Sequence, residues 1–326
     1  MTPIDLFTPT DYQELSVLSF GAGTDSTCIL EKLIDDEEYR QEYAPNRLLV
    51  VMSDTGDEFE ETYRHVKETQ QKCIEAGIEF VFITSDMGYH SESWLNLRHF
   101  YRTHTAIGSK AYPKTCSDRL KIQPIYRFLE QWLSDNYGVT CNKKKGFYEF
   151  TATYGKINMM VGIAKGEEKR ASDAANNPNK WYRKNINNVY PLLEKGFDRQ
   201  ACQDYLHSKG MYVIPSNCKA CPFLSLEELE YLRRFHPESL EEWVELEAAK
   251  LHKHKDKNAV IVTDKSGETV FDRHGKPKTQ NKNYGVFGVK PLTVKITEAR
   301  KSFSEWTDER IREYRYSHGH CVSTVY

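Results

Sequence analysis

Short apolar runs alternate with amphipathic segments over the first half of the chain. Runs at 15–20, 48–52, 80–83 and 159–163 predict buried strands, and each ends in glycine or polar residues. Segments with helical spacing around 29–34, 58–76 and 122–136 separate these runs. Strands that alternate with helices predict an α/β fold, in which a parallel sheet is covered by helices on both faces.

From about residue 199 the pattern becomes mainly helical. Helical spacing occurs at 199–209, 226–235, 240–250 and 306–315. The stretch 255–282 is polar and rich in turn residues, and it predicts a hairpin that pairs 259–262 with 268–271. We place a domain boundary near residue 175.

The composition is that of a globular protein, with 39% hydrophobic and 28% charged residues among 326. We expect a cytoplasmic protein with no membrane partner, because no apolar run approaches a membrane span and no signal-peptide pattern is present. Residues 1–100 carry 7 basic and 20 acidic residues against a chain total of 45 and 47, so the remainder is basic. Such a surplus suits either a polyanion such as nucleic acid or a solvated surface.

A glycine-rich turn, Ser19-Phe20-Gly21-Ala22-Gly23-Thr24-Asp25-Ser26, follows the first apolar run and precedes a helix. Glycines at this place let the backbone approach a phosphate, and the amides at a helix start point toward it. Ser19, Thr24 and Ser26 add hydroxyl donors, while Asp25 could orient the turn or help to hold Mg²⁺. The turn lacks the Gly-Lys-Ser/Thr ending of a Walker A loop. A turn without any ligand is the alternative.

Three other positions carry candidate chemistry. Asp54 ends the second strand, where it could contact ribose, base or Mg²⁺, or cap the following helix. Arg119 and Lys121 could bind phosphate oxygens or be ordinary surface charges, and they share a face only in an extended segment. Glu167 and Arg170 have the spacing of an ion pair on one helical face.

Eight cysteines are present, and the pair Cys218-Lys219-Ala220-Cys221 has metal-ligand spacing. It could hold zinc, hold an iron–sulfur cluster, act as a redox pair, or consist of two unrelated buried residues. Cys28 follows the glycine turn on an apolar helix and is expected in the core. Cys321, near the C-terminus, could be a ligand, a catalytic thiol or part of a mobile tail.

The motifs together resemble a known superfamily. Residues 19–26 are similar to the PP-loop of the ATP-pyrophosphatase superfamily, written Ser-Gly-Gly-x-Asp-Ser. Residues 54–62 resemble the Asp-Thr-Gly-x-x-Phe-x-Glu-Thr stretch of phosphoadenosine-phosphosulfate (PAPS) reductases, and 116–124 resemble their Cys-x-x-x-x-Lys-x-x-Pro element. Residues 162–170 match Gly-Ile-x-x-x-Glu-x-x-Arg, and 215–223 resemble the closing element of DNA phosphorothioation sulfurtransferases. The resemblance spans about 16–225.

The resemblance implies a Rossmann-like PP-loop fold that binds ATP with Mg²⁺. The implied nucleotide-binding residues are Ser19, Phe20, Gly21, Gly23, Thr24, Asp25, Ser26, Asp54, Arg119 and Gly162. The implied catalytic residues are Asp25, Lys121 and Arg170. The domains expected on this basis are a PP-loop domain at 1–175, a metal-binding helical region at 176–254 and an extension of unknown role at 255–326.

A metal centre is also implied. Adenylylsulfate reductases hold a [4Fe-4S] cluster with a Cys-Cys pair and a later Cys-x-x-Cys, but Thr115 stands here at the first position of the pair. Only Cys116, Cys218 and Cys221 carry over, and three cysteines with one open iron resemble the arrangement in some tRNA thiolases. We therefore predict a [4Fe-4S] cluster on these three residues, with Zn²⁺ as the alternative and Cys321 as a possible fourth ligand.

The leading functional prediction is an ATP-dependent sulfurtransferase that adenylates DNA or tRNA, releases pyrophosphate and works with a cysteine desulfurase and other modification proteins. A PAPS or adenylylsulfate reductase is one alternative, although the Glu-Cys-Gly-x-His context of the reductases is absent around Cys321. The other is a non-catalytic, metal-stabilised nucleotide- or nucleic-acid-binding subunit. Trp181-Tyr182-Arg183-Lys184 could stack bases and bind the backbone, or simply pack.

Overall fold

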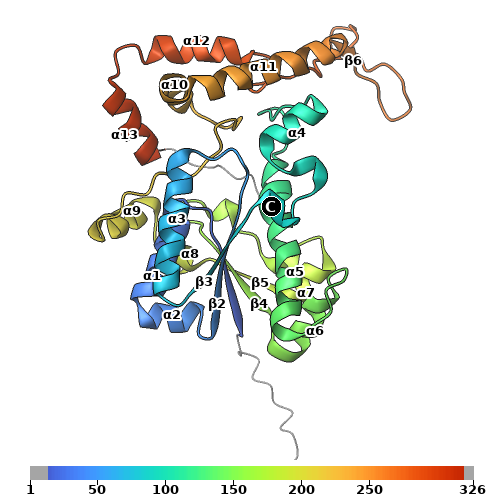
Figure 1. Cartoon of the computed structure of the whole chain (residues 1–326). Coiled ribbons are helices and arrows are strands. Elements are labelled where there is room, and N and C mark those ends of the chain that lie inside the picture. The colour runs from blue at the N-terminus through green and yellow to red at the C-terminus, as the bar shows by residue number, and fades with distance from the viewer. Residues whose placement is uncertain (1–13, 319–326) are drawn as a thin grey trace, which may run out of the picture. The chain divides into compact units, whose positions relative to one another are not determined.

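The computed structural model describes residues 14–318 (Figure 1). These residues form two compact units, which are described separately. Unit 1 comprises residues 14–92 and 116–216, and unit 2 comprises 93–115 and 217–318. Within the described range, none of the helices combines the length and apolar character needed to cross a membrane.

Unit 1 is built on five parallel strands in the order β3-β2-β1-β4-β5. The strands are β1 (Leu15–Ser19), β2 (Arg47–Ser53), β3 (Glu79–Ile83), β4 (Ile157–Val161) and β5 (Ile186–Val189). The predicted α/β class is confirmed, and the four predicted strands lie where the apolar runs stand. β5 escaped prediction because two asparagines interrupt its apolar pattern. It follows residue 175, so the sheet extends past the boundary drawn from the sequence.

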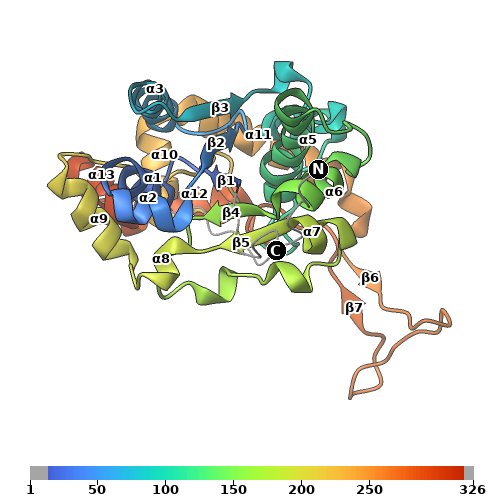
Figure 2. The ribbon, with the colours of Figure 1, turned by 90° about the horizontal axis from the view of Figure 1, so that it is seen from below.

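Helices cover both faces of this sheet (Figures 1 and 2). One face carries α1 (Thr24–Asp35), α2 (Glu37–Tyr43), α3 (Glu60–Glu75), α8 (Pro191–Glu194) and α9 (Arg199–Ser208). The other carries α5 (Gln123–Tyr137), α6 (Lys145–Tyr154) and α7 (Lys180–Asn185). Successive strand residues point to opposite faces of the sheet. Leu18 and Val50 pack against the helices of the first face, and Val17 and Leu49 pack against those of the second. Short turns of 3-10 helix lie at Ser85–Met87, Glu92–Trp94, Glu168–Arg170, Ala174–Asn176 and Lys255–Lys257.

The aromatic residues of α7 pack in this second layer. Trp181 lies 5.3 Å and Tyr182 5.6 Å, centroid to centroid, from the ring of Tyr126. Both rings meet Tyr126 edge-on, and Trp181 also contacts Phe147. The structure therefore shows the packing role of these two aromatics.

The strand order places a topological switch between β1 and β4. From β1 the chain proceeds outward to β2 and β3, and it then returns to add β4 on the opposite side of β1. Helices that follow neighbouring strands then lie on opposite faces, which opens a crevice at the carboxyl ends of the two strands. The loops after β1, β2 and β4 carry the glycine turn, Asp54 and Gly162 at this edge of the sheet.

Unit 2 is mainly helical. Its helices are α4 (Leu97–His104), α10 (Leu226–Phe235), α11 (Pro237–Lys253), α12 (Leu292–Ser302) and α13 (Asp308–His318). A capping box between Ser225 and Glu228 starts α10, which packs against α11, α12 and α13. The predicted helices correspond to α10, α11 and α13, whereas α4 and α12 were not predicted.

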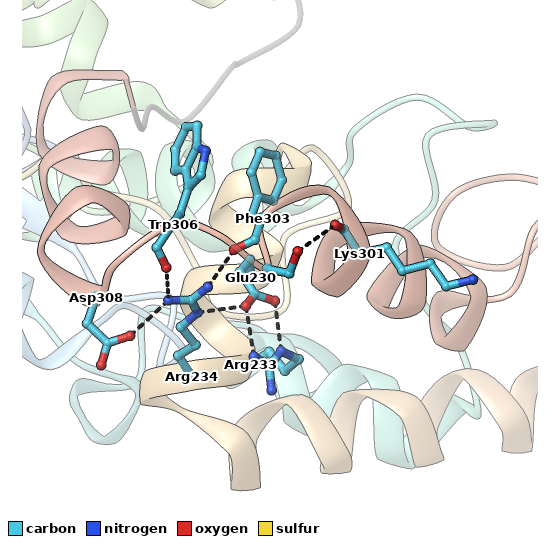
Figure 3. Close-up of polar contacts among 8 residues, drawn as sticks. Glu230, Arg233, Arg234, Lys301, Phe303, Trp306 and Asp308 are labelled. Carbon is cyan, nitrogen blue, oxygen red and sulfur yellow. Dashed lines mark hydrogen bonds and ion pairs between the residues drawn. The ribbon is translucent and has the colours of Figure 1, made fainter.

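An arginine network ties α10 to the connection between α12 and α13 (Figure 3). Arg234 donates hydrogen bonds to the carbonyl oxygens of Phe303 and Trp306, each at 2.8 Å, and to Asp308. Glu230 is buried and accepts from both Arg233 and Arg234. The network satisfies the C-cap carbonyl of α12, the carbonyl of Trp306 in the connection and a buried carboxylate together.

The polar stretch of unit 2 forms a protruding antiparallel structure (Figure 2). Its paired strands are β6 (Val260–Ile261) and β7 (Thr279–Gln280). The predicted hairpin is therefore wrong in its main pairing, because β6 takes its partner about 10 residues later in the chain than expected. One bridge of the predicted kind, Thr263 with Thr269, does occur.

Candidate nucleotide site

The glycine turn joins β1 directly to α1. Ala22 adopts a left-handed backbone with φ of 54°, and Gly23 is the N-cap residue of α1. Because Gly23 has no side chain, no side-chain hydrogen bond caps the first amides of this 12-residue helix. The turn thus has the backbone form of an anion-binding helix start.

Ser26 shapes the turn from inside. Its hydroxyl accepts a hydrogen bond from the amide of Gly21 and donates one to the carbonyl oxygen of Gly23, both at 3.2 Å. Ser26 is buried, so this hydroxyl serves the turn itself in the present structure. Its predicted contact with a ligand stays a prediction.

Thr24 differs from Ser26. Its Oγ1 is buried, and among residues 14–318 it has no hydrogen-bond partner. Buried hydroxyls nearly always have a hydrogen-bond partner. Thr24 Oγ1 is therefore available to form a hydrogen bond with an oxygen of a ligand. Asp25 is half-buried in the same first turn of α1.

Phe20 serves the core. Its ring is buried and meets the ring of Phe80 edge-on at 5.5 Å, and its amide donates to the carbonyl of Val51 at 2.9 Å. His65 also lies beside this ring and is 2.9 Å from the hydroxyl of Thr27 on α1. Burial lowers the pKa of His65 to about 4, so this imidazole is neutral near pH 7.

Two glycines allow close approach to the turn. A Cβ placed on Gly162, the first residue after β4, would lie 2.8 Å from the backbone nitrogen of Ser26 and 3.1 Å from the carbonyl carbon of Asp25. A Cβ on Gly23 would lie 3.2 Å from Oγ of Ser216. Any side chain at these two positions would crowd its neighbour, so only glycine fits there. The end of β4 and the segment that ends in Ser216 therefore both pack directly against the turn.

Asp54 follows β2 and is held in an Asx-type turn. One carboxylate oxygen accepts from the amide of Gly56 at 2.8 Å and from the hydroxyl of Tyr63 at 2.9 Å. Burial raises the pKa of Asp54, while these two hydrogen bonds oppose the rise. The helix-cap alternative for Asp54 is wrong, because Phe59 occupies the N-cap position of α3.

A buried hydrogen-bond chain connects the end of β2 to the Cys116–Pro124 segment. Ser53 Oγ donates to the carbonyl of Leu120 at 2.5 Å, and His90 Nε2 lies 3.2 Å from that hydroxyl and 3.0 Å from the carbonyl of Asp54. Leu120 belongs to a π-helical turn, Ser117–Ile122, that leads into α5. Arg119 and Lys121 are therefore on a helical turn, so they do not share a face as they would in an extended segment.

Lys121 forms an ion pair with a fully buried carboxylate. Its Nζ lies 3.2 Å from Oε1 of Glu58, which also accepts from Thr55 Oγ1 at 3.3 Å. The Lys121 side chain remains partly exposed, so it can also face a ligand. Arg119 is more exposed and lies near Asp118 and Gln123.

Arg170 forms the ion pair expected from its spacing. Its guanidinium contacts Glu167, and Arg199 contacts the other oxygen of the same carboxylate at 3.3 Å. Two arginines on one glutamate leave a local positive charge beside the loop that follows β4. A direct contact of Arg170 with a nucleotide stays a prediction.

The predicted cluster ligands fall in both units. Cys116 belongs to unit 1, whereas Cys218 and Cys221 belong to unit 2, so their shared site stays a prediction. Cys28 is buried in the core as expected, and Cys321 lies outside the described residues.

Unit 2 builds a fixed loop around the cysteine pair. The buried amide of Asn217 is held between Glu228, at 2.8 Å, and Arg315, at 3.0 Å. A turn at 219–220 separates the two cysteines, which is the local geometry that lets two thiolates reach one metal. Lys110 Nζ donates to the carbonyl of Leu224 at 3.2 Å, so the segment that leads to Cys116 packs on this loop.

Several residues of the site were missed by sequence reasoning. Glu58 and Ser216 stand inside the quoted motifs, yet only their neighbours were assigned roles. Lys121 needs a carboxylate partner inside the protein, and that need was the signal that could have identified Glu58. His65 and His90 had no local signal, because only the folded chain brings them to the turn and to β2.

Comparison with known proteins gives limited similarity. No protein-family model matches the chain. The uncharacterized protein MJ0066 of Methanocaldococcus jannaschii is 25% identical over 207 residues, which is 60% of this chain and 35% of that protein. The chain thus spans about a third of the length of this curated relative. The U34-tRNA thiolase NcsA from Methanococcus maripaludis, solved with its [4Fe-4S] cluster, is 14% identical, with 77% of this chain and 76% of that chain covered at a TM-score of 0.37. A structural similarity of this size carries no argument about function.

Proposed function

We propose that this chain is an enzyme of the PP-loop type that binds ATP at the glycine turn and transfers its adenylyl group to an acceptor. The observation that carries the proposal is the turn itself. It stands at the β1/β4 switch, and it offers uncapped amides of α1 and the buried Thr24 hydroxyl to a phosphate.

The proposed reaction is a displacement at the α-phosphorus. An acceptor oxygen forms a bond to this phosphorus, and the bond to the bridging oxygen of the β-phosphate breaks. Pyrophosphate leaves with the electron pair, and the acceptor's proton passes to solvent. Since negative charge builds on the leaving group, positioning and positive charge supply most of the catalysis.

The chain's own residues fit these needs. Glu58 orients Lys121, whose ammonium would act as a point charge on a phosphate oxygen. Glu167 holds Arg170 in the same way, and Arg199 keeps the surroundings positive. Asp54 and Asp25 are the carboxylates available to the ribose or to Mg²⁺ of the bound nucleotide.

We further propose that the adenylated acceptor receives sulfur, with Cys116, Cys218 and Cys221 holding a [4Fe-4S] cluster. Sulfur at the oxidation level of sulfide bonds to the activated acceptor atom, and AMP leaves with the electron pair of the bond that breaks. Three thiols are a suitable donor set, and the fixed loop around Cys218 and Cys221 is packed against the segment that leads to Cys116. When bound, such a cluster supplies an open iron for sulfur. Zn²⁺ on the same residues is the alternative.

A nucleic acid, DNA or tRNA, is the proposed acceptor. Unit 2 carries 23 lysine and arginine residues against 17 aspartate and glutamate residues in 93–115 and 217–318. A basic unit of this kind suits a polyanionic acceptor. A sulfur donor such as a cysteine desulfurase, with a two-electron reductant that releases its persulfide sulfur as sulfide, would complete the system.

The nucleotide proposal is tested with Thr24→Val, which keeps the side-chain shape and removes the hydroxyl. ATP affinity should fall about tenfold, as expected for a lost hydrogen bond to a charged group. Thr69→Val is the matched control, because Thr69 is also buried but its hydroxyl donates to the carbonyl of His65. Equal ATP affinity in the two variants would contradict the site.

The reaction is identified by its products. With ATP, nucleic acid and sulfide, pyrophosphate and AMP should form in equal amounts, whereas release of sulfite from PAPS would identify a reductase. Iron, acid-labile sulfide and zinc are measured on protein purified without oxygen. About four irons and four sulfides per chain, lost in Cys116→Ala, support the cluster; full metal occupancy in that variant rules out the shared site.

A further inference from the structure

A forked arm, defined as residues 260–280, extends from unit 2 (Figure 2). β6 and β7 form its stem, and beyond the stem the chain makes two hairpin fingers. The first finger, 263–269, is closed by the bridge between Thr263 and Thr269, and the second, 271–277, by the bridge between Phe271 and Pro277.

The fork is held by a closed ring of three backbone hydrogen bonds. Val262 donates to the carbonyl of Lys278, Lys278 donates to Val270, and Val270 donates to Val262, at 2.8, 2.8 and 2.9 Å. The ring gives the arm a defined backbone, although nearly every residue from 261 to 280 is exposed. The arm therefore contributes almost nothing to the core of unit 2.

Both finger tips repeat one construction, Asp-x-x-Gly. Asp264 accepts from the amides of Ser266 and Glu268, and Asp272 accepts from those of His274 and Lys276, at 2.8 to 3.0 Å. The glycines have positive φ of 90° and 75°. These turns fix the tips with side-chain oxygens rather than with apolar packing.

The second finger concentrates positive charge beside an exposed aromatic ring. Arg273, Lys276 and Lys278 are all exposed, and Asp272 is the one acidic residue of 271–278. Phe271 is 58% exposed. A singly exposed phenylalanine is common on protein surfaces. Here the three cations beside it supply the charge that attracts a polyanionic backbone.

We propose that the second finger binds nucleic acid that carries unpaired bases. Arg273, Lys276 and Lys278 contact phosphates, and Phe271 stacks on a base. Aromatic stacking between cations that follow a backbone is the usual way in which single strands are bound. This inference rests on the proposed nucleic-acid acceptor and names the element that holds it.

The basic groove lined by Arg233, Arg234, Arg300 and Lys301 is the competing surface of unit 2. Two of its arginines are committed to Glu230 and to backbone carbonyls, so their charge already serves the fold. The groove therefore provides the control in the experiment.

The test measures binding of a labelled single-stranded oligonucleotide by the full chain, without ATP, at several salt concentrations. In R273A/K276A/K278A the affinity should fall, and the salt slope should decrease by about 2, since each phosphate contact on a single strand contributes roughly 0.7. K290A/R300A/K301A, called the groove variant, removes the same charge from unit 2 outside the arm: Arg300 and Lys301 line the groove, and Lys290 lies outside it. This variant should keep the slope of the unaltered chain.

Phe271→Ala should lower affinity about tenfold with the salt slope unchanged, and Phe271→Trp should restore it. Thermal midpoints should not move, because these side chains are exposed. Unchanged affinity in the arm variants, or a loss confined to the groove variant or to duplex probes, would overturn the inference. Because binding is measured without ATP, failure here leaves pyrophosphate release unaffected as a separate test of the proposed function.

Discussion

Gly162 lies against the amide of Ser26 so closely that a Cβ at residue 162 would be 2.8 Å from that nitrogen. The contact joins the end of β4 to the first turn of α1 across the switch between β1 and β4. It fixes the position of the glycine turn by backbone against backbone, which side-chain motion cannot relieve.

Gly162→Ala should therefore displace the turn and lower ATP affinity by about tenfold or more, because small shifts at a phosphate site are costly. Isothermal titration with ATP measures the effect. Gly166→Ala is the control on the same loop: its φ of 95° brings strain of about 1 kcal/mol, but no atom lies within 4 Å of the added methyl. Equal ATP affinities in the two variants would show that the contact has no role in binding.

Gly23→Ala tests the segment on the other side of the turn. The new methyl would meet Oγ of Ser216 at 3.2 Å, so we expect ATP affinity to fall several-fold. Adding Ser216→Ala removes that oxygen and leaves the nearest atom at 3.6 Å, so the double variant should recover most of the affinity. No recovery would mean that Gly23 is needed for the ligand itself.

Lys121→Met separates a structural from a catalytic role of this lysine. Removing the cation beside buried Glu58 should cost about 2 to 4 kcal/mol of unfolding free energy. Adding Glu58→Gln should restore most of the stability, as measured by urea unfolding. Pyrophosphate release should stay low in the double variant, and its recovery would assign Lys121 a structural role only.

His65 should make stability depend on pH. Its folded-state pKa of about 4 is below the ordinary value of 6.5, so the unfolded chain binds the proton first as pH falls. Stability should be highest above about pH 6.5 and decline toward pH 4, by about 3 kcal/mol at most from this residue.

The measurement is urea unfolding at about pH 7 and about pH 4.5, compared with His65→Gln. The variant should lose less stability between the two conditions, since it has no imidazole to protonate. An identical decline in both proteins would mean that His65 is not the titrating group.

The sheet of unit 1 could be predicted because four of its strands are uninterrupted apolar runs. β5 could not, since Asn187 and Asn188 hide its pattern. The place of the glycine turn followed from its position after the first strand. Its packing could not be foreseen, because the contacts of Gly162 and Ser216 depend on residues about 140 and 190 positions later in the chain.

Unit 2 also contains one element that the sequence predicts and one that it does not. α10 was predicted with its bounds from its helical spacing, and the structure shows that a local capping box between Ser225 and Glu228 starts it. The stem of the forked arm was mispaired, because the run at 268–271 has better strand composition than Thr279-Gln280. The ring of backbone hydrogen bonds among Val262, Val270 and Lys278 explains why β6 pairs with the two-residue strand β7 instead.

Residues 93–115 are synthesised long before their partners in unit 2. Arg98 is buried and bonds to the carbonyl of Ser239, which lies 141 residues later, and it also contacts Glu242. On the ribosome, α4 must remain undocked while β4 and β5, the last two strands of the sheet, are made. A nascent chain that stalls before α11 therefore displays this segment, and it is the place where a chaperone would first be needed.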